Sequence, residues 1–281
     1  MQVSELWRYP VKSMIGETVD AVELDELGIV GDRTWATRDL ERGGIRGAKK
    51  IAGLMRLAAR DLGDGHVAIT LPDGSTVSTT DADVHDRVSD ALGHRVRLER
   101  LRPADDLDHF RRGGSDSDDM LTELRGIFGR DHDEPLPDLS VFPPAIVEFE
   151  SPPGTYYDAF PLMVMTTAAL AALQSALPDS NIDVRRFRPS LVVDADGADA
   201  GTDGHPEFDW VGRRASIGTA TVEFTVACPR CVMVTREIDE TVPADRAVLR
   251  HIVRDLDQNV GVYATVVTPG RITVGDAVQL R

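Results

Sequence analysis

The sequence predicts a β-rich α+β fold, in which a β-rich first half is followed by a barrel or curled sheet that carries a few helices. Three observations support this prediction. Residues 1–101 alternate apolar and polar side chains in short runs that glycine and aspartate interrupt. The second half contains further strand-like runs. A few of its segments have the capping residues and composition of helices.

In the first half, the alternating runs predict a series of short strands. A Pro-Asp-Gly turn at 72–74 predicts a hairpin, because proline presets one turn residue and glycine supplies the other backbone conformation. The expected strands cover residues 19–24, 27–32, 34–37, 67–71 and 75–79.

In the second half, Thr166 is placed to cap an alanine-rich helix over 167–176, directly after an apolar strand. A second helix is expected over 244–255, where Arg and His near its end favour a helix C-terminus. The expected strands cover residues 161–165, 191–193, 220–226, 232–235 and 272–280.

A change in composition predicts the domain organisation. Residues 102–144 are rich in Asp, Gly, Ser and Pro, with one short helical stretch near 120–128. We therefore expect a β-rich N-terminal domain over 1–101, a mobile acidic connector or insertion over 102–144, and a C-terminal domain over 145–281.

Composition excludes several classes of function. The net charge of −16 and the pI near 4.8 argue against a nucleic-acid partner, since phosphate binding needs a cationic surface. No apolar run is long enough to cross a bilayer, and the N-terminus lacks the pattern of a signal peptide. We expect a cytoplasmic protein without a membrane partner. Two basic stretches, 46–50 and 185–188, are candidates for holding an anionic small molecule.

The two cysteines form a C-x-x-C pair, which in a cytosolic chain favours metal or redox chemistry over a disulfide. Cys231 directly precedes the apolar run 232–235, so a strand would hold its thiolate, a soft metal ligand, in place. Cys228 would face the opposite side unless Pro229 makes a turn, and is expected to be structural. An inert buried thiol is the alternative for Cys231. Zinc is not expected, because the chain lacks a second C-x-x-C and a histidine pair at ligand spacing.

Five stretches of sequence, in order, carry a family resemblance. They are Tyr9-Pro10-Val11-Lys12-Ser13, 27–33, Arg186-Phe187-Arg188-Pro189, Cys228-Pro229-Arg230-Cys231 and 269–276. In these stretches the chain resembles the molybdenum cofactor sulfurase C-terminal (MOSC) proteins that also have an N-terminal β-barrel domain. Within that family it is similar to the mitochondrial amidoxime reducing component and the bacterial hydroxylaminopurine-resistance proteins.

The resemblance implies an oxidoreductase that holds a molybdenum cofactor (Mo-molybdopterin) and reduces N-hydroxylated or N-oxygenated small molecules. It implies that Cys231 is the protein ligand of molybdenum, and so the catalytic position, and that the remaining matched residues contact the pterin and its phosphate. Family members often have Asn where this chain has Ser190, so that position is not assigned. The matched cofactor contacts are Lys12, Ser13, Arg33, Arg188 and a backbone site at Thr166 and Thr167, where a strand-to-helix turn exposes amide groups that suit an anion.

The resemblance also bears on the source of electrons. Some bacterial relatives continue into a ferredoxin domain, whereas this chain has no further cysteines for an iron–sulfur cluster. We therefore expect a separate donor, either a ferredoxin, a flavoprotein or a cytochrome b5-like protein. Two alternatives stay open: a non-catalytic carrier of the cofactor or of sulfur, and a binding module that has lost the metal.

Overall fold

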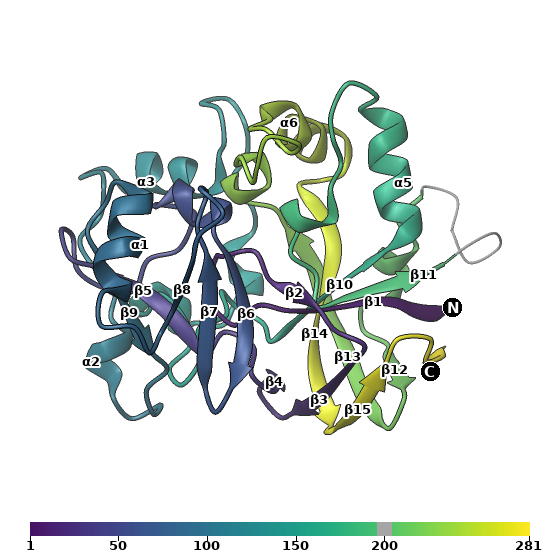
Figure 1. The fold of residues 1–281 in the computed structure, drawn as a ribbon. Coiled ribbons are helices and arrows are strands. Elements are labelled where there is room, and N and C mark those ends of the chain that lie inside the picture. Colours follow the sequence, from purple (N-terminus) through teal and green to yellow (C-terminus); the bar gives the residue numbers. More distant parts are fainter. Residues whose placement is uncertain (196–203) are drawn as a thin grey trace.

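A computed structural model describes residues 1–195 and 204–281, and it confirms the β-rich α+β fold. Figure 1 shows two lobes side by side, one built mainly from the first half of the chain and the other mainly from the second half. The first strand of the chain lies in the second lobe, where it joins the large sheet, and the chain then passes into the first lobe. The two lobes are therefore tied together from the N-terminus onward.

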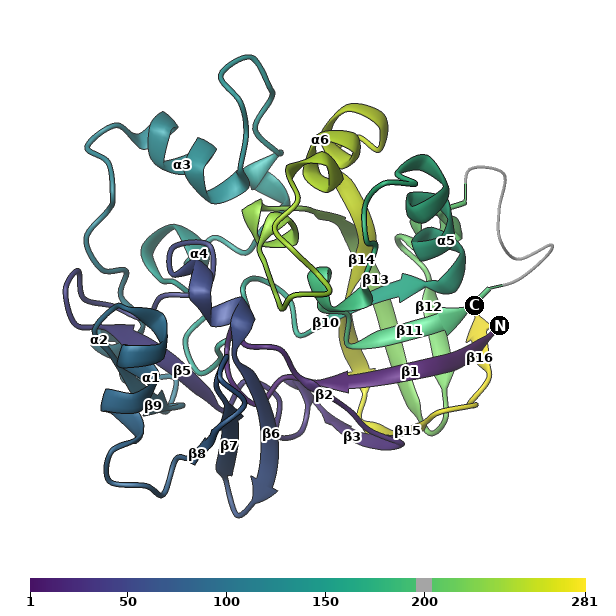
Figure 2. The same ribbon diagram turned by 45° about the horizontal axis from the view of Figure 1, so that its top comes forward.

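The second lobe is built on a curled sheet of eight strands in the described part of the chain, in the order β16-β12-β13-β14-β10-β11-β1-β2. Figure 2 shows how its curl brings the two termini close together, although they belong to strands near opposite ends of this order. Its strands are β1 (Gln2–Arg8), β2 (Glu17–Thr18), β10 (Leu162–Thr166), β11 (Leu191–Asp194), β12 (Arg214–Ile217), β13 (Ala220–Pro229), β14 (Asn259–Thr268) and β16 (Val278–Leu280).

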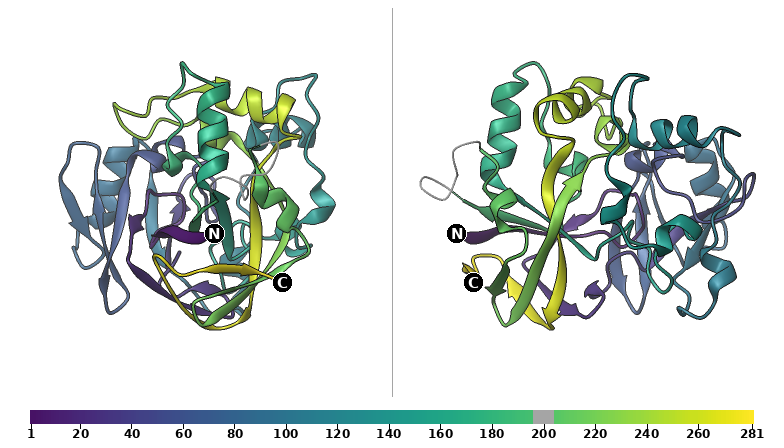
Figure 3. Two further views of the ribbon diagram at one scale, coloured as in Figure 1. Left: turned by 90° about the vertical axis from the view of Figure 1, so that its right-hand side faces the viewer. Right: turned by 180° about the vertical axis from the view of Figure 1, so that it is seen from behind.

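One pair of neighbouring strands in the described part of this sheet is parallel. Strands β10 and β11 run in the same direction, and helix α5 (Thr167–Ala176) lies in the connection between them. The hydroxyl of Thr166 accepts a hydrogen bond from the Ala169 amide at 3.1 Å, which satisfies one free donor at the helix start. Together with α6 (Arg246–Asp255), α5 covers one face of the sheet, as Figure 3 shows from two sides.

The first lobe contains smaller sheets that are paired antiparallel. The hairpin at Pro72 is confirmed, with the Leu71 amide donating to the Ser75 carbonyl at 2.8 Å. The strands outside the large sheet are β3 (Ala21–Asp25), β4 (Gly28–Ile29), β5 (Trp35–Asp39), β6 (Ala58–Gly63), β7 (His66–Thr70), β8 (Thr76–Ser78), β9 (Val96–Arg100) and β15 (Gly270–Thr273).

The predicted connector carries several short helices and contacts both lobes. Lys50 of the first lobe pairs with Asp116 at 3.0 Å, and Arg130 donates to the Gln258 side chain of the second lobe at 3.0 Å. The boundaries of the three domains stay a prediction. The remaining helices are η1 (Ala52–Arg56), α1 (Val84–Leu92), α2 (Leu107–Phe110), α3 (Met120–Phe128), η2 (Leu139–Val141), α4 (Ala145–Glu148), η3 (Val184–Arg186), η5 (Pro206–Trp210) and η6 (Val232–Thr235).

The predicted strand over 232–235 is wrong, because these residues form the 3₁₀ helix η6. Pro229 has no amide hydrogen to donate, and β13 ends there. The apolar side chains then serve two cores: Met233 packs into the core of the first lobe, and Val234 packs under α5 and α6. A short apolar run fits a buried strand and a buried turn equally well, so tertiary packing decided between them.

Two other expected strands are shorter or divided. Of residues 27–32 only Gly28 and Ile29 pair, and the chain turns at Gly31, whose φ is +85°. Residues 272–280 form the end of β15 and all of β16, separated by a turn at Gly275 with φ +92°. In both cases a glycine supplies a left-handed conformation that breaks the strand. Among the described residues, no helix is long and apolar enough to span a bilayer.

Candidate functional site

Cys231 lies where the two lobes meet. It follows the end of β13, is half-buried, and packs against the apolar core of the first lobe. Cys228 differs from it, being 2% exposed and packed beneath the helices of the second lobe. Burial raises the pKa of the Cys228 thiol, although Arg230, whose Nη1 lies 3.0 Å from its Sγ, acts in the opposite direction. Cys231 is therefore the more accessible of the two thiols.

Four cations lie close enough to Cys231 to interact with it electrostatically, and we call them the cationic cluster: Lys49, Arg130, Arg230 and Arg236. Within the described chain none of the three arginines forms an ion pair with a carboxylate. Arg130 and Arg230 are buried, and their hydrogen bonds go to carbonyls, to the Gln258 amide and to the Cys228 thiol.

Burial, and then the charge of nearby Arg250, lower the pKa of Arg130 to about 10. The Nε atoms of Arg230 and Arg236 are buried and have no partner in the described structure. Buried polar atoms are normally paired, so these two donors mark a place that suits an anion.

Asp158 connects the cationic cluster to Lys12, which lies in the first of the five matched stretches. The Lys12 Nζ lies 2.6 Å from Asp158 Oδ1 and donates to the Tyr156 carbonyl at 2.8 Å, and the Lys49 Nζ lies 2.9 Å from Asp158 Oδ2. Although burial opposes it, the two ammonium groups hold the pKa of Asp158 well below its usual range. Burial lowers the pKa of Lys12, which is 3% exposed.

Tyr9 forms a platform under two further predicted residues. The guanidinium of Arg188 lies 4.2 Å from the centre of the Tyr9 ring and that of Arg33 lies 5.2 Å from it. Arg33 is paired with Asp32, whereas Arg188 donates to the Met14 carbonyl and has no carboxylate partner in the described chain. Burial, and then the charge of Arg33, lower the pKa of Arg188 to about 10.

The backbone of this region is strained. Among the described residues, six non-glycine positions have positive φ, and three of them are the predicted residues Ser13 (+68°), Arg33 (+48°) and Arg188 (+59°). Such conformations cost about 1–3 kcal/mol each and collect at functional sites. The backbone of Gly47 lies so close to Ser13 that a Cβ at Gly47 would be 2.5 Å from the Ser13 Oγ. The fold holds these segments together at a cost in stability.

The structure brings together Cys231, Lys12, Ser13, Arg33 and Arg188 around Asp158 and Tyr9, but it places Thr166 and Thr167 elsewhere. The Asp158 segment leads into the start of β10, whereas both threonines lie at its end, about 13 Å along the strand at roughly 3.3 Å per residue. Their hydroxyls have structural partners: Thr166 donates to Glu207 at 2.7 Å, and Thr167 donates to Asp194 at 3.2 Å. The expected cofactor contact uses their backbone and not these hydroxyls, so it stays a prediction.

Sequence reasoning did not single out Asp158, Arg130 or Arg236. Asp158 is one acidic residue among 47, and nothing in its local sequence distinguishes it. Lys49 lay in a stretch already noted for its charge. The 185–188 stretch was expected to hold an anion, but two of its arginines are occupied by protein partners. Arg186 donates to four backbone carbonyls, and Arg185 pairs with Asp183 and Asp239. Only Arg188 of that stretch faces the site.

The described residues contain no group of three or more His, Cys, Asp or Glu side chains arranged to hold a metal ion. Cys231 is thus a single thiol beside the cationic cluster. Ser190, unassigned from the sequence, is buried and its Oγ accepts from the Met163 amide at 3.3 Å.

Comparisons with known proteins show the family to which the chain belongs. The MOSC N-terminal beta barrel domain model matches residues 1–111, and the MOSC domain model matches residues 152–279. The chain is 24% identical to mitochondrial amidoxime reducing component 2 of Bos taurus, over 98% of this chain and 82% of that protein. It is 26% identical to mitochondrial amidoxime-reducing component 1 of Homo sapiens, over 99% of this chain and 82% of that protein.

Among solved structures, the YuaD protein of Bacillus subtilis aligns with a TM-score of 0.46 and 11% identity, covering 99% of this chain and 94% of that one. The two domain models together account for both lobes, in the order expected from the five sequence stretches. The family predicted from the sequence is confirmed: the chain belongs to the MOSC proteins that carry an N-terminal MOSC β-barrel domain.

Proposed function

We propose that this protein is an oxidoreductase that binds a molybdenum cofactor through Cys231 and reduces N-hydroxylated or N-oxygenated small molecules. Family membership supports the cofactor, and the names of the two mammalian relatives support the reaction. The observation that carries the proposal is the set of buried arginines without carboxylate partners around a half-buried thiol.

The charge of this set runs against that of the whole molecule. The chain has a net charge of −16, yet Arg130, Arg188 and Arg230 are buried without an acidic partner in the described structure. Burying an unpaired charge is costly, so a site that retains several such charges is suited to an anionic ligand. A molybdopterin carries a phosphate and a dithiolene, and both groups are anionic. The residues present therefore fit the cofactor.

Each side chain has a role in this proposal. Cys231 would supply the protein thiolate to the metal, with Lys49 and Arg230 stabilising its negative charge. Lys12 and Arg188, with Arg33 and the Ser13 segment, would bind and orient the pterin and its phosphate. When bound, the cofactor supplies the two-electron redox chemistry that, with two protons, converts an N–OH group into N–H and water.

The electrons would come from a separate protein. We propose a ferredoxin, a flavoprotein or a cytochrome b5-like donor, because the described residues offer no cysteine set for an iron–sulfur cluster. Reduction of a purified donor, followed by its reoxidation on addition of this protein and an amidoxime, is the expected behaviour. Full turnover with a nicotinamide cofactor alone would contradict a separate donor.

The two cysteines provide a matched experiment. Wild type, Cys231→Ser and Cys228→Ser would be expressed in a host that makes the molybdenum cofactor, and molybdenum and pterin would be measured per folded chain. We expect molybdenum in the wild type and in Cys228→Ser, and at least a tenfold loss in Cys231→Ser with an unchanged circular dichroism spectrum. Equal molybdenum in both variants would remove Cys231 from the site.

The same samples separate the proposal from its alternatives. A carrier would hold the cofactor but release it to another apoenzyme without reducing an amidoxime at a measurable rate. A binding module that has lost the metal would contain no molybdenum even in the wild type. Stable molybdenum together with reductase turnover would exclude both.

A further inference from the structure

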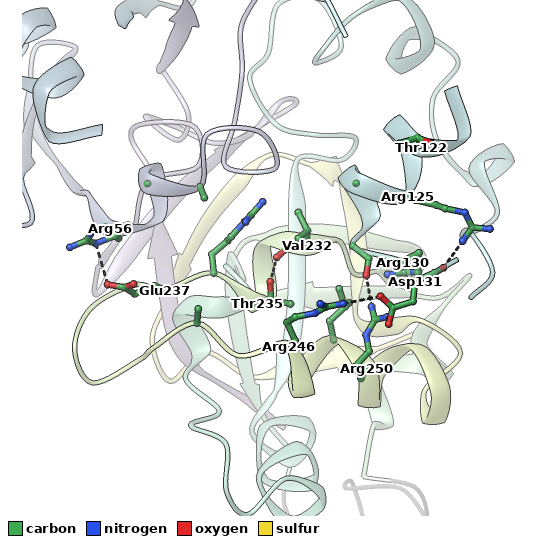
Figure 4. Close-up of a pocket in the computed structure, with 17 residues that line it drawn as sticks. Arg56, Thr122, Arg125, Arg130, Asp131, Val232, Thr235, Glu237, Arg246 and Arg250 are labelled. Atoms are coloured by element: carbon green, nitrogen blue, oxygen red, sulfur yellow. Dashed lines mark hydrogen bonds and ion pairs between the residues drawn. The ribbon is translucent and has the colours of Figure 1, made fainter. Parts of the chain in front are cut away.

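A cavity lies beside Cys231 and shares two arginines, Arg130 and Arg236, with the cationic cluster. It has a volume of about 780 Å³ and lies between η1, α3, η6 and α6. Figure 4 shows its lining, with Arg125, Arg130, Arg246 and Arg250 gathered around Asp131 and with Arg56 and Glu237 at the other side. This volume is in the range of small-molecule sites.

The lining of this arginine pocket is strongly basic. It contains six arginines and two carboxylates, Asp131 and Glu237. Glu237 lies 3.3 Å from Arg56, and Asp131 pairs with Arg246 and Arg250, each at 2.8 Å. The lining arginines are Arg56, Arg125, Arg130, Arg236, Arg246 and Arg250.

Three of these arginines have no carboxylate partner in the described structure: Arg125, Arg130 and Arg236. Arg125 donates to the carbonyls of Asp131 and Glu134, at 2.6 Å and 2.9 Å. Arg236 donates to the Lys49 carbonyl at 3.3 Å, and its buried Nε has no partner. One further carboxylate, Glu134, pairs with Arg250 but is not part of the lining. The pocket thus keeps an excess of positive charge.

The arginine pocket adjoins the thiol. Val232, the next residue after Cys231, lines it. Arg130 and Arg236 also line it and belong to the cationic cluster that interacts with Cys231. A molecule held in the pocket would therefore have one end beside Cys231 and the other among the arginines of α3 and α6.

We propose that the arginine pocket binds the oxyanionic group of the substrate, so that this protein selects N-oxygenated molecules that also carry a carboxylate or a similar anion. This inference rests on the proposed function and names its substrate class. Guanidinium groups bind oxyanions through paired hydrogen bonds, and several converging on one cavity favour an anion over a neutral analogue. On a molecule with a net charge of −16, a local basic cavity also concentrates anions that the remaining surface repels.

The test compares two probes that differ in one group. Binding of 4-carboxybenzamidoxime and of uncharged benzamidoxime to the protein purified from a cofactor-competent host would be measured by calorimetry. We expect the carboxylated probe to bind at least tenfold more tightly to the wild type. Equal affinity for the two probes would overturn the proposal.

Two pocket variants and one control locate the effect. Arg125→Gln and Arg246→Gln should each weaken binding of the carboxylated probe by fivefold or more and leave the uncharged probe unchanged. Arg246 is 74% exposed, so its variant should fold even if Arg125→Gln does not. Arg214→Gln, an exposed arginine on β12 paired with Glu223, is the control and should change neither affinity. If Arg246→Gln and a folded Arg125→Gln both bind the carboxylated probe as tightly as the wild type does, the anion is bound elsewhere.

Binding and turnover fail independently. If the protein reduces neither amidoxime when supplied with a chemical reductant but binds the carboxylated one through these arginines, the proposed reaction is wrong and the pocket assignment stands. If it reduces both amidoximes with equal KM, the proposed reaction stands and the substrate class is wrong.

Discussion

The two ends of strand β10 show how different a functional and a structural polar region are in this molecule. At its start, the Asp158 segment meets Lys12, Lys49 and Arg188, where buried cations outnumber the acidic groups that pair with them. At its end, Thr166 and Thr167 donate to two carboxyl groups and cap a helix. The first region carries cations without carboxylate partners, whereas in the second both carboxyl groups accept a hydroxyl donor and only the buried Oε1 of Glu207 is left without a partner among the described buried carboxyl oxygens there.

A mutation in one of these regions should mainly change the stability of the fold, and a mutation in the other should mainly change the amount of bound ligand. A satisfied, buried network stabilises the fold, and losing one member leaves another without a partner. An excess of buried positive charge destabilises the protein until an anion binds, so removing one of those cations should affect ligand content more than folding. Mutations at the two ends of β10 should therefore give opposite results.

Of the two ends of β10, the larger effect on stability is expected at the end of the strand. Thr166→Val removes the hydrogen bond to Glu207, which is fully buried, and the N-cap of α5. Loss of the cap and of a partner for a buried carboxyl should lower the free energy of unfolding by about 2–4 kcal/mol. Urea denaturation followed by circular dichroism measures this change.

Thr167→Val is the matched control for that variant. Its hydroxyl donates to Asp194, which is only half-buried, so we expect a loss of about 1 kcal/mol or less. Molybdenum per folded chain should stay at the wild-type level in both variants. A large loss of molybdenum in folded Thr167→Val would instead restore these threonines to the cofactor site, as the family resemblance implies.

A smaller effect, in the opposite property, is expected at the start of β10. Arg188→Met keeps an apolar stem over the Tyr9 ring but removes a buried charge whose pKa is lowered to about 10. Cofactor content should fall about fivefold, equivalent to about 1 kcal/mol of binding free energy, and the stability of the cofactor-free protein should change by less than about 1 kcal/mol.

Arg186→Met serves as the contrast two residues away. Arg186 is 1% exposed and donates to four carbonyls, so its loss should destabilise the fold by several kcal/mol, about 1 kcal/mol or more for each freed carbonyl. If Arg188→Met proved as destabilising as Arg186→Met, the division between structural and ligand-binding arginines would be wrong.

The sequence predicted those parts of the fold that local chemistry determines. Thr166 caps α5, and Asp119 and Gly129 bound the helix over 120–128, because a cap needs only a few neighbouring residues. The turn at Pro72 was predicted for the same reason. The helix η6 was not, since packing of Met233 against a distant core decides its conformation.

The site itself could be predicted only where a motif marked it. Lys12, Arg33, Arg188 and Cys231 lie in recognisable stretches, and the structure brings them together. Asp158 could not be found in this way, because its partners lie far away in sequence, with 146 residues separating it from Lys12. Arg130 differs from an ordinary surface arginine because it is buried without a carboxylate partner in the described structure, and this too is a property of the fold.

The smallest predicted effect tests a cation that is fully paired. Hydrogen bonds from the Thr241 hydroxyl, and then from Arg185, lower the pKa of Asp239 from 3.8 to about 2. A carboxyl with a lowered pKa stabilises the fold above its unfolded pKa, and this contribution is lost as pH falls through the folded one. Because Asp239 is 42% exposed, we expect Asp239→Asn to cost only about 1 kcal/mol at pH 6. The deficit should shrink between pH 4 and pH 2 in urea denaturation, and molybdenum content should not change.

A pH-independent deficit would mean that Asp239 acts through packing, whereas a loss of molybdenum would show that Arg185, once released, alters the site that Arg188 occupies.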